Sequence, residues 1–285
     1  MTIRPLSSLD EPQLEAFLRP LRDSSMFLRS NAQRGGLNPP SGSREQVFVA
    51  AFHDGKVAGV VAHGASGMLL LQAPDSAADL ARACIGLSQR RVTGLAGPPV
   101  QVEQAMAALH LKAEDASYHR DEGLYGLDLC DLIVPAALAT GRLTCRAPTA
   151  GERDTLCAWR LAYDIESLGS ADTDETRQRS TRFLDQQMAD GNAWVAVDGG
   201  APVSLSAFNA ALPDIVQLGG IYTPPELRGR GFARVAVAAS LLAARARGAE
   251  RATLFTSNPS AARAYEALGF LRTGSYAVVL FRGPR

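Results

Sequence analysis

Several features that would identify a common class of function are missing from this sequence. Charge is balanced, with 29 Lys and Arg against 29 Asp and Glu, which disfavours a nucleic-acid binder that depends on a broad basic surface. Lysine is nearly absent, since only Lys56 and Lys112 occur, so lysine-based chemistry is unexpected. No G-x-x-x-x-G-K-S/T string occurs, which excludes a P-loop nucleotide hydrolase.

The cysteines offer neither a disulfide framework nor a metal site. Cys84, Cys130, Cys145 and Cys157 form no C-x-x-C pair and have no histidine at zinc-finger spacing, so we expect free thiols and no metal. Apolar runs are broken by Arg or Gly well before the roughly 18 residues that a membrane helix needs. No secretory leader pattern opens the chain. We therefore expect a cytoplasmic protein that does not enter a membrane.

The length and the order of predicted elements indicate two domains. A chain of 285 residues with 46% hydrophobic residues exceeds the usual size of one domain. The order strand–helix–helix–strand–strand–strand–helix–strand–helix–strand is predicted twice, which indicates an internal duplication. We expect an α/β domain over residues 1–132, a linker over 133–141 and a second α/β domain over 142–285.

Residue patterns set the bounds of the predicted elements. Helices are expected over 75–89, 100–110, 151–168, 173–189, 230–247 and 259–268. Asp54-Gly55 predicts a hairpin, and the glycine- and proline-rich stretch 35–42 predicts a loop. Short strands are expected over 91–95, 124–132 and 277–281, the last two closing the two halves.

The clearest functional signal lies in residues 221–233, which are predicted to form a strand, a tight turn and the start of a helix. Gly229 and Gly231 remove side chains where the backbone turns sharply. The helix then directs its free N–H groups and its positive dipole end at one place, which favours a phosphate or pyrophosphate. Arg228 and Arg230 add positive charge. The alternative is a glycine-rich helix cap without a ligand.

This string resembles the coenzyme A loop, R/Q-x-x-G-x-G/A, of the GCN5-related N-acetyltransferases. Asn258, Tyr265 and Gly269-Phe270 are similar to a second segment of that family. The resemblance implies tandem acetyltransferase-like domains, each a mixed, mostly antiparallel sheet flanked by helices. It also implies an N-acyltransferase that moves an acetyl group from acetyl-CoA to a primary amine by direct attack in a ternary complex. The amine's identity and the oligomeric state stay open.

The resemblance assigns roles residue by residue. Asn258 is expected to contact the coenzyme near its pantetheine, and Tyr265 to protonate the leaving thiolate. The alternative for Tyr265 is a core tyrosine with a satisfied hydroxyl. A backbone N–H near Tyr222 would stabilise the oxyanion. The pantetheine arm is expected along Ile221, Tyr222 and Thr223, and the pyrophosphate on Arg228, Gly229, Arg230, Gly231, Phe232 and Ala233.

The general base is less clearly indicated. All four histidines lie in the first half, and Thr253 stands where some relatives place Glu. Glu166 and Asp164, at the end of a predicted helix, are the candidates, and we select Glu166. An exposed carboxylate at a helix end and a water chain are the alternatives. Gln217 and Asn209 are possible polar contacts for the acceptor.

The first half lacks both motifs. Its third long strand is followed by Asp75 instead of a glycine pair, and Met106 and Pro99 are the expected counterparts of Tyr265 and Asn258. We interpret it as a degenerate acetyltransferase-like domain. Two alternatives for the whole chain are a non-catalytic module that binds or senses coenzyme A and a scaffold that binds nothing.

Overall fold

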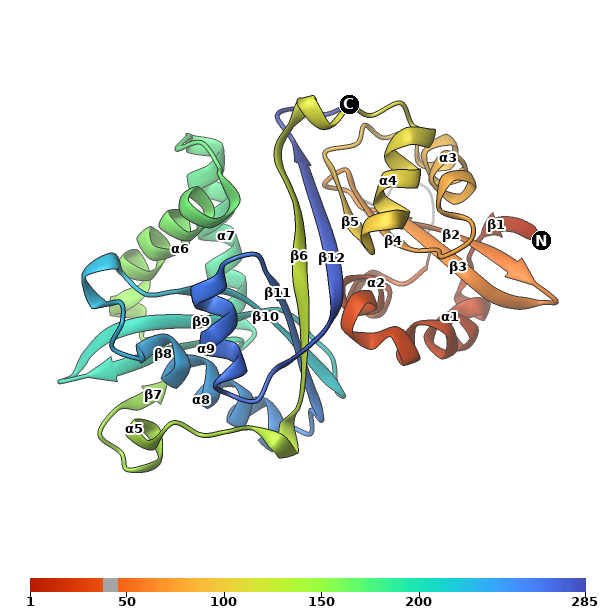
Figure 1. Cartoon of the computed structure of the whole chain (residues 1–285). Coiled ribbons are helices and arrows are strands. Elements are labelled where there is room, and N and C mark those ends of the chain that lie inside the picture. The colour runs from red at the N-terminus through yellow and green to blue at the C-terminus, as the bar shows by residue number, and fades with distance from the viewer. Residues whose placement is uncertain (38–45) are drawn as a thin grey trace. The chain divides into compact units, whose positions relative to one another are not determined.

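The structure, a computed structural model, describes residues 1–37 and 46–285 and divides the chain into two compact units (Figure 1). Unit 1 comprises Met1–Leu124 and Gly274–Arg285, and unit 2 comprises Tyr125–Thr273. The division differs from the predicted domains at 1–132 and 142–285, because the last residues of the chain belong to unit 1. The predicted loop at 35–42 lies, from residue 38 onward, outside the described residues.

The order of elements occurs twice, as the sequence predicted, and both halves mix helices with strands. A short helix, α5 (Ala136–Ala139), lies in the predicted linker. The first set is β1 (Thr2–Pro5), α1 (Glu11–Leu18), α2 (Arg22–Gly35), β2 (Val47–His53), β3 (Lys56–His63), β4 (Met68–Gln72), α3 (Ala77–Ser88), β5 (Gly94–Gly97), α4 (Pro99–Ala108) and β6 (Ala116–Asp128). The second set is β7 (Thr144–Arg146), α6 (Arg153–Leu168), α7 (Asp174–Ala189), β8 (Ala193–Asp198), β9 (Ala201–Ala211), β10 (Ile215–Tyr222), α8 (Phe232–Ala246), β11 (Arg251–Thr256), α9 (Pro259–Glu266) and β12 (Leu271–Phe281).

Each unit contains a mostly antiparallel sheet in which one pair of strands is parallel. The strand order in unit 1 is β1-β2-β3-β4-β5-β12-β6, with β4 and β5 parallel. In unit 2 the order is β6-β11-β10-β9-β8-β7, with β10 and β11 parallel. Because β5 is the counterpart of β11 and β6 that of β12, the two halves exchange their last strands: β12 lies next to β5, and β6 next to β11. The expected fold, a central mixed sheet flanked by helices, is confirmed.

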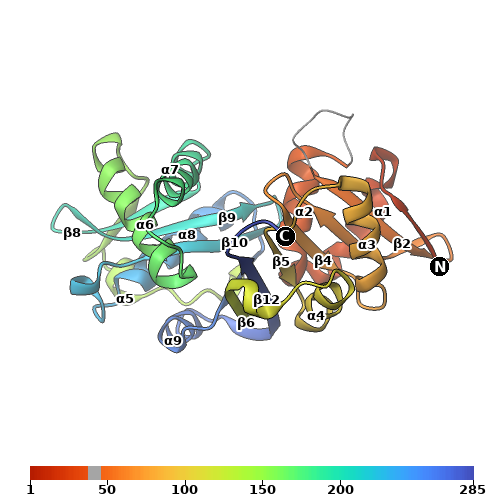
Figure 2. The ribbon, with the colours of Figure 1, turned by 90° about the horizontal axis from the view of Figure 1, so that it is seen from above.

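Helices cover both faces of each sheet (Figures 1 and 2). In unit 2, Leu156 and Leu184 of α6 and α7 pack on Val195 and Val197 of β8. On the opposite face α8 packs on the sheet through a set of buried residues that includes Phe232, Val235, Ala196 and Val203. In unit 1, α3 and α4 pack on a core that also includes Ala277, Val279 and Phe281 of β12.

Two predicted strands were misplaced at their starts. β6 begins at Ala116 instead of 124, and β12 at Leu271 instead of 277. In both, the first residues are largely polar and mostly exposed, so no apolar pattern marked them. The predicted strand at 91–95 is observed as Gly94–Gly97. The hairpin is confirmed, since Asp54 and Gly55 both have a positive φ.

The same local motif opens both halves. Arg4 makes two hydrogen bonds to Asp10, which also caps the backbone of Ser7. Arg146 makes two hydrogen bonds to Glu152, which caps the backbone of Thr149 in the same way. The spacing R-x-x-S/T-x-x-D/E is identical in the two places. This repeated device supports the interpretation of an internal duplication.

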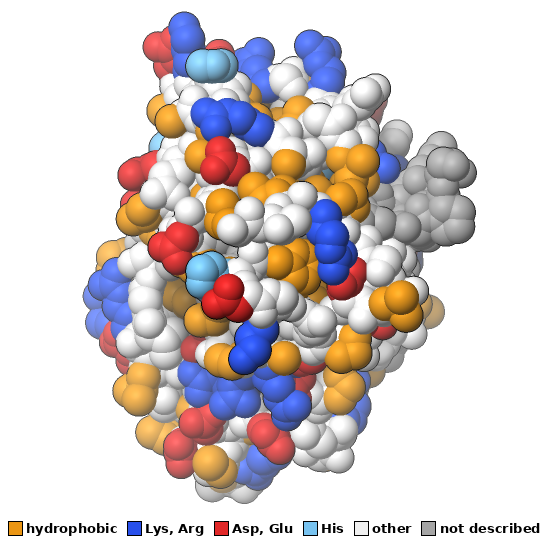
Figure 3. All heavy atoms as spheres, turned by 90° about the vertical axis from the view of Figure 1, so that its right-hand side faces the viewer, with side chains coloured by type: hydrophobic (Ala, Val, Ile, Leu, Met, Phe, Trp, Pro, Cys, Tyr) orange, Lys and Arg blue, Asp and Glu red, His pale blue; other side chains and the backbone are white. Residues whose placement is uncertain are grey.

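One face of the molecule shows charges of both signs. On the face seen in Figure 3, basic side chains are interspersed with acidic ones.

Within the described part of the chain, no helix is both long and apolar enough to cross a membrane. No group of three or more His, Cys, Asp or Glu in residues 1–37 and 46–285 could hold a metal ion. The four cysteines are free.

Candidate active site

The C-terminal end of β10 separates from its parallel neighbour. The register pairs Ile215, Val216 and Gln217 with successive residues of β11 and ends at Thr253, although β10 runs on to Tyr222. On its other edge, β10 carries a bulge between Gly219 and Tyr222. The bulge explains the positive φ of Gly220, which is 65°. Beyond Gln217, β10 therefore continues without a register partner in β11, which leaves a gap between the ends of the two strands.

The loop after β10 ends in a helix without a side-chain cap. Gly229 and Gly231 have φ values of 77° and 81°, a conformation that favours glycine. Gly231 is the N-cap of α8, and no side chain accepts a hydrogen bond from the first turn. The first N–H groups of a helix have no partner within the helix. Here they remain available to an anion.

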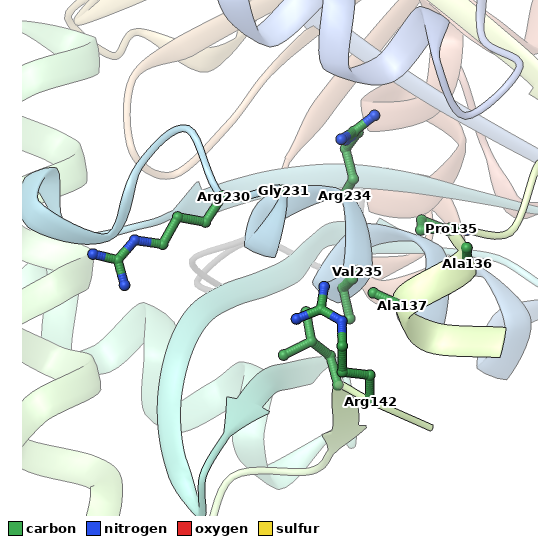
Figure 4. A pocket seen from close by; sticks show the side chains of 9 residues that line it. Pro135, Ala136, Ala137, Arg142, Arg230, Gly231, Arg234 and Val235 are labelled. Carbon is green, nitrogen blue, oxygen red and sulfur yellow. The ribbon is translucent and has the colours of Figure 1, made fainter. Parts of the chain in front are cut away.

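A pocket of about 240 Å³ adjoins this helix start (Figure 4). Arg142, Arg230 and Arg234 line it, and no acidic residue does. None of these three arginines forms a hydrogen bond or ion pair with another described residue. Arg142, which precedes β7, was not among the predicted site residues, because nothing in its local sequence distinguishes it from a surface arginine.

Arg228 binds within the protein instead of pointing to the pocket. Its Nη2 donates to Glu166 Oε2 over 2.7 Å, and its Nε donates to the carbonyl of Thr223 over 2.9 Å. The guanidinium also lies 5.7 Å from the centre of the Tyr222 ring. The structure thus brings together Arg228 of the predicted coenzyme loop and Glu166, the predicted base, and both are partly exposed.

Asn258 and Tyr265 of the second motif lie at the two ends of α9. Asn258 is the N-cap, and its Oδ1 accepts hydrogen bonds from the backbone of Ser260 and Ala261. Tyr265 is buried, with its ring 6.0 Å from that of Phe270. Its hydroxyl has no hydrogen bond to another described residue. Burial, with a smaller contribution from Tyr163, raises the pKa of Tyr265 above its usual range, so the hydroxyl stays protonated.

The other polar residues near the gap have different surroundings. Thr253, the residue in place of a glutamate, is buried and donates to the carbonyl of Tyr125 over 3.0 Å, which is a structural role. Gln217 is also buried, and no described residue donates a hydrogen bond to its Oε1. Asn209 lies against Gly219 at a second bulge of the β9–β10 pair.

Sequence reasoning missed a buried arginine on α6. Arg160 is 8% exposed and pairs with Asp164, its neighbour one turn later, over 2.8 Å. Asp164 also accepts a hydrogen bond from Ser180 of α7, over 2.5 Å. This buried network gives Asp164, the second predicted candidate for the base, two hydrogen bonds of its own. The spacing of Arg160 and Asp164 is common on exposed helices, so the sequence gave no sign of their burial.

The corresponding region of unit 1 is closed. A Cβ at Gly97 of β5 would lie 2.8 Å from the carbonyl oxygen of Leu71, so β4 and β5 stay close at their ends. The backbone N–H of Ala73, just after β4, donates to Oε1 of buried Gln101 over 2.6 Å. A side chain of α4 thus satisfies a group that would face a ligand.

Backbone hydrogen bonds and helix caps identify the residues of unit 1 that correspond to the second motif of unit 2. Leu111 donates to the carbonyl of Met106 as Phe270 does to that of Tyr265, so Met106 takes the place of Tyr265. Pro98, not Pro99, is the N-cap of α4 and matches Asn258. The predicted match to Pro99 was wrong by one residue, because α4 is longer than α9.

Comparisons with known proteins agree with this geometry. The model of the acetyltransferase (GNAT) family matches residues 158–270, which span α6 to the end of the second motif. No curated protein sequence matches the chain.

Several solved structures have the same fold over nearly the whole chain. A GCN5-related N-acetyltransferase from Kribbella flavida is 19% identical, covers 92% of this chain and 96% of its own, and has a TM-score of 0.56. One from Sphaerobacter thermophilus is 15% identical, with coverages of 98% and 94% and a TM-score of 0.58. A tandem GNAT protein from the clavulanic acid biosynthesis pathway is 14% identical, with coverages of 100% and 99% and a TM-score of 0.52.

Proposed function

Because residues 158–270 match the model of the GNAT acetyltransferase family, we propose that unit 2 transfers an acetyl group from acetyl-CoA to a primary amine. The single observation that carries this proposal is the gap between β10 and β11, which leads to the uncapped N-terminus of α8. The family match indicates an acyl transfer in general. That acetyl-CoA is the donor and a primary amine the acceptor is our proposal.

The residues around the gap fit a long anionic thioester. The N–H groups at the start of α8, together with Gly229, Gly231 and Arg230, would hold the pyrophosphate. The backbone of residues 221–223 would bond the pantetheine arm as an added strand would. Arg142 and Arg234 add positive charge beside the helix start. Asn258 Oδ1 is occupied by the helix cap, so its Nδ2 is the group left for the coenzyme.

The acyl donor supplies an activated carbonyl, and the protein positions groups around it. Tyr265 would hold a proton at its hydroxyl and donate to the departing sulfur. Its raised pKa makes full proton transfer less favourable, so its main contribution is a hydrogen bond to the developing thiolate. A backbone N–H near Tyr222, next to the bulge, would donate to the carbonyl oxygen as negative charge develops there.

Glu166 would take the proton from the attacking amine. One of its oxygens accepts from Arg228, and Oε1 stays available. We therefore propose that Glu166 acts through Oε1, or through a water bound there. Unit 1, whose equivalent strands stay together, is proposed to be degenerate and to bind no coenzyme.

A screen of primary amines with acetyl-CoA, monitored by thiol release, tests the proposed function. We expect transfer to at least one amine and none from variants that cannot bind the coenzyme. If acetyl-CoA binds tightly while no amine of a broad panel is acetylated, the chain is a binding or sensing module instead.

A further inference from the structure

The most unusual polar group in unit 2 is the guanidinium of Arg160. It is nine-tenths buried, yet its Nε and Nη1 have no hydrogen-bond partner in residues 1–37 and 46–285. Its Nη2 donates to Asp164. One N–H on Nε and two on Nη1 are therefore without an acceptor. Unpaired donors of a buried charged group are costly and rare, which suggests a partner that binds there.

The position of this guanidinium is next to the proposed reaction centre. Nη1 lies 2.5 Å from where a Cβ on Gly220 would be, so it fills the space beside the β10 bulge. The guanidinium carbon is 4.9 Å from the centre of the Tyr163 ring. Tyr163 in turn lies close enough to Tyr265 to act on it electrostatically. Arg160 and the proposed acid Tyr265 are thus both neighbours of one residue.

An unpaired acceptor lies on the same face of the sheet. Gln217 is two residues before Gly219 on β10, and the register pairs these two with Ala210 and Ala207 of β9. That face is the one covered by α6 and α7, because Tyr222, further along it, contacts Trp159 of α6. Gln217 Oε1 is buried and has no donor within the described part of the chain. The face therefore offers N–H donors from Arg160 and an oxygen acceptor from Gln217.

We propose that unit 2 accepts amines that carry a carboxylate, as α-amino acids do, and that Arg160 binds this carboxylate. A guanidinium is suited to a carboxylate, because its charge and its directed N–H groups both favour an anionic acceptor. Since Nε and Nη1 lie on different edges of the guanidinium, one carboxylate oxygen would accept from Nη1, which lies beside the β10 bulge. Asp164 and Ser180 hold the guanidinium in place by using Nη2 alone. Gln217 Oε1 would accept a hydrogen bond from the amino group of the bound amino acid. The positive charge of this group offsets the negative charge of the ligand's carboxylate. The guanidinium carbon lies over the ring of Phe183, 3.8 Å from its centre.

The inference rests on the proposed function but is tested by binding instead of turnover. The full chain, saturated with coenzyme A, is titrated calorimetrically with the common amino acids and, for each that binds, with the same amine lacking its carboxylate. We expect binding of at least one amino acid and at least about ten-fold weaker binding of its decarboxylated partner. Thiol release with acetyl-CoA is measured in parallel.

Two variants separate recognition from stability. Arg160→Lys keeps a cation beside Asp164 but removes Nε and Nη1, and should weaken amino-acid binding at least about ten-fold. Arg153→Lys changes another ion-paired arginine of α6, the partner of Asp185, and should leave binding unchanged. Affinity for acetyl-CoA should be the same in both variants and the parent.

Three outcomes would overturn the inference. One is that no amino acid binds the parent protein. Another is that Arg160→Lys binds amino acids as the parent does. The third is that this variant lowers kcat equally for amines with and without a carboxylate at unchanged affinity, which would make Arg160 an oxyanion donor. Loss of thiol release with retained amino-acid binding would contradict only the proposed function.

Discussion

At the scale of single residues, the account depends on which side chains are already bonded within the protein. Thr253 and Asp164 have hydrogen-bond partners of their own, so neither is a free acid or base. Tyr265, in contrast, is buried, and its hydroxyl has no hydrogen-bond partner among the residues that the structure describes. Glu166 is bonded through one oxygen to Arg228. The residues with spare hydrogen-bonding capacity are therefore the ones to test.

Tyr265→Phe removes only the hydroxyl and leaves the contact with Phe270. Since the hydroxyl has no partner within the described residues, stability should change little. We expect kcat to fall by roughly 10–1000-fold, with acetyl-CoA affinity unchanged. If this variant retains full kcat while Glu166→Gln loses it, Tyr265 is a core residue only.

The pH profile of kcat gives a second test of Tyr265. Its pKa is raised, so the protonated form persists to a higher pH than for an exposed tyrosine, whose pKa is about 10. Between pH 6 and about 9, ionisation of Tyr265 should therefore cause no fall in kcat. The pH profiles of the parent and of Tyr265→Phe should have the same shape in this range. Such a decline, present in the parent and absent in the variant, would show a lowered pKa and contradict the assignment.

At the scale of elements, the sequence specified more of the fold than of the site. Helices such as α6 and α7 were predicted because apolar residues recur at helical spacing. The starts of β6 and β12 were missed because their first residues are polar and exposed. The coenzyme loop was recognisable because Gly229 and Gly231 occur in a short, specific string. Arg160 was not, because its burial depends on contacts between distant segments.

The motif that opens the second half should make stability depend on pH. Hydrogen bonds from Arg146, followed by those from Thr149, lower the pKa of Glu152 to about 2. A lowered pKa adds stability above the unfolded value of about 4.3, and this is lost as pH falls toward 2. Glu152→Gln should therefore cost roughly 1 kcal/mol of unfolding free energy at pH 7.

Urea titrations of parent and variant between pH 7 and 2 measure this effect. The difference should shrink below about pH 4.3 as the parent carboxylate becomes protonated. Asp10→Asn, in the matching motif of unit 1, should behave alike, because its pKa is also lowered by Arg4. A constant difference over the whole range would mean that the charge of Glu152 contributes nothing.

At the scale of the whole molecule, the exchanged strands make the two halves depend on each other. Unit 2 includes β6 from Tyr125 onward, and unit 1 includes the end of β12. A fragment of residues 142–285 would lack β6 and would leave β12 without β5. We expect that fragment to have a lower melting temperature than the full chain, or to be insoluble, as thermal denaturation can establish. A fragment as stable as the full chain would contradict the exchange.

The full chain should bind one coenzyme A. In unit 1, Gln101 occupies the end of β4 and Leu71 lies against Gly97, so no equivalent gap exists there. Calorimetry should give a stoichiometry of one per chain. Two equivalent sites would show that β4 and β5 open in solution and that unit 1 is not degenerate.

The most direct test of the coenzyme site is the thermal stabilisation of the full chain by acetyl-CoA in two glycine variants. Gly231→Asp places a carboxylate at the uncapped start of α8, while Gly199→Asp changes a glycine with a positive φ, in the turn between β8 and β9, where a Cβ meets no atom. A ligand at 100 times its Kd stabilises the native state by about 2.7 kcal/mol. We predict this stabilisation in the parent and in Gly199→Asp, and its loss in Gly231→Asp. Equal stabilisation of Gly231→Asp and Gly199→Asp would contradict the assignment of the coenzyme site.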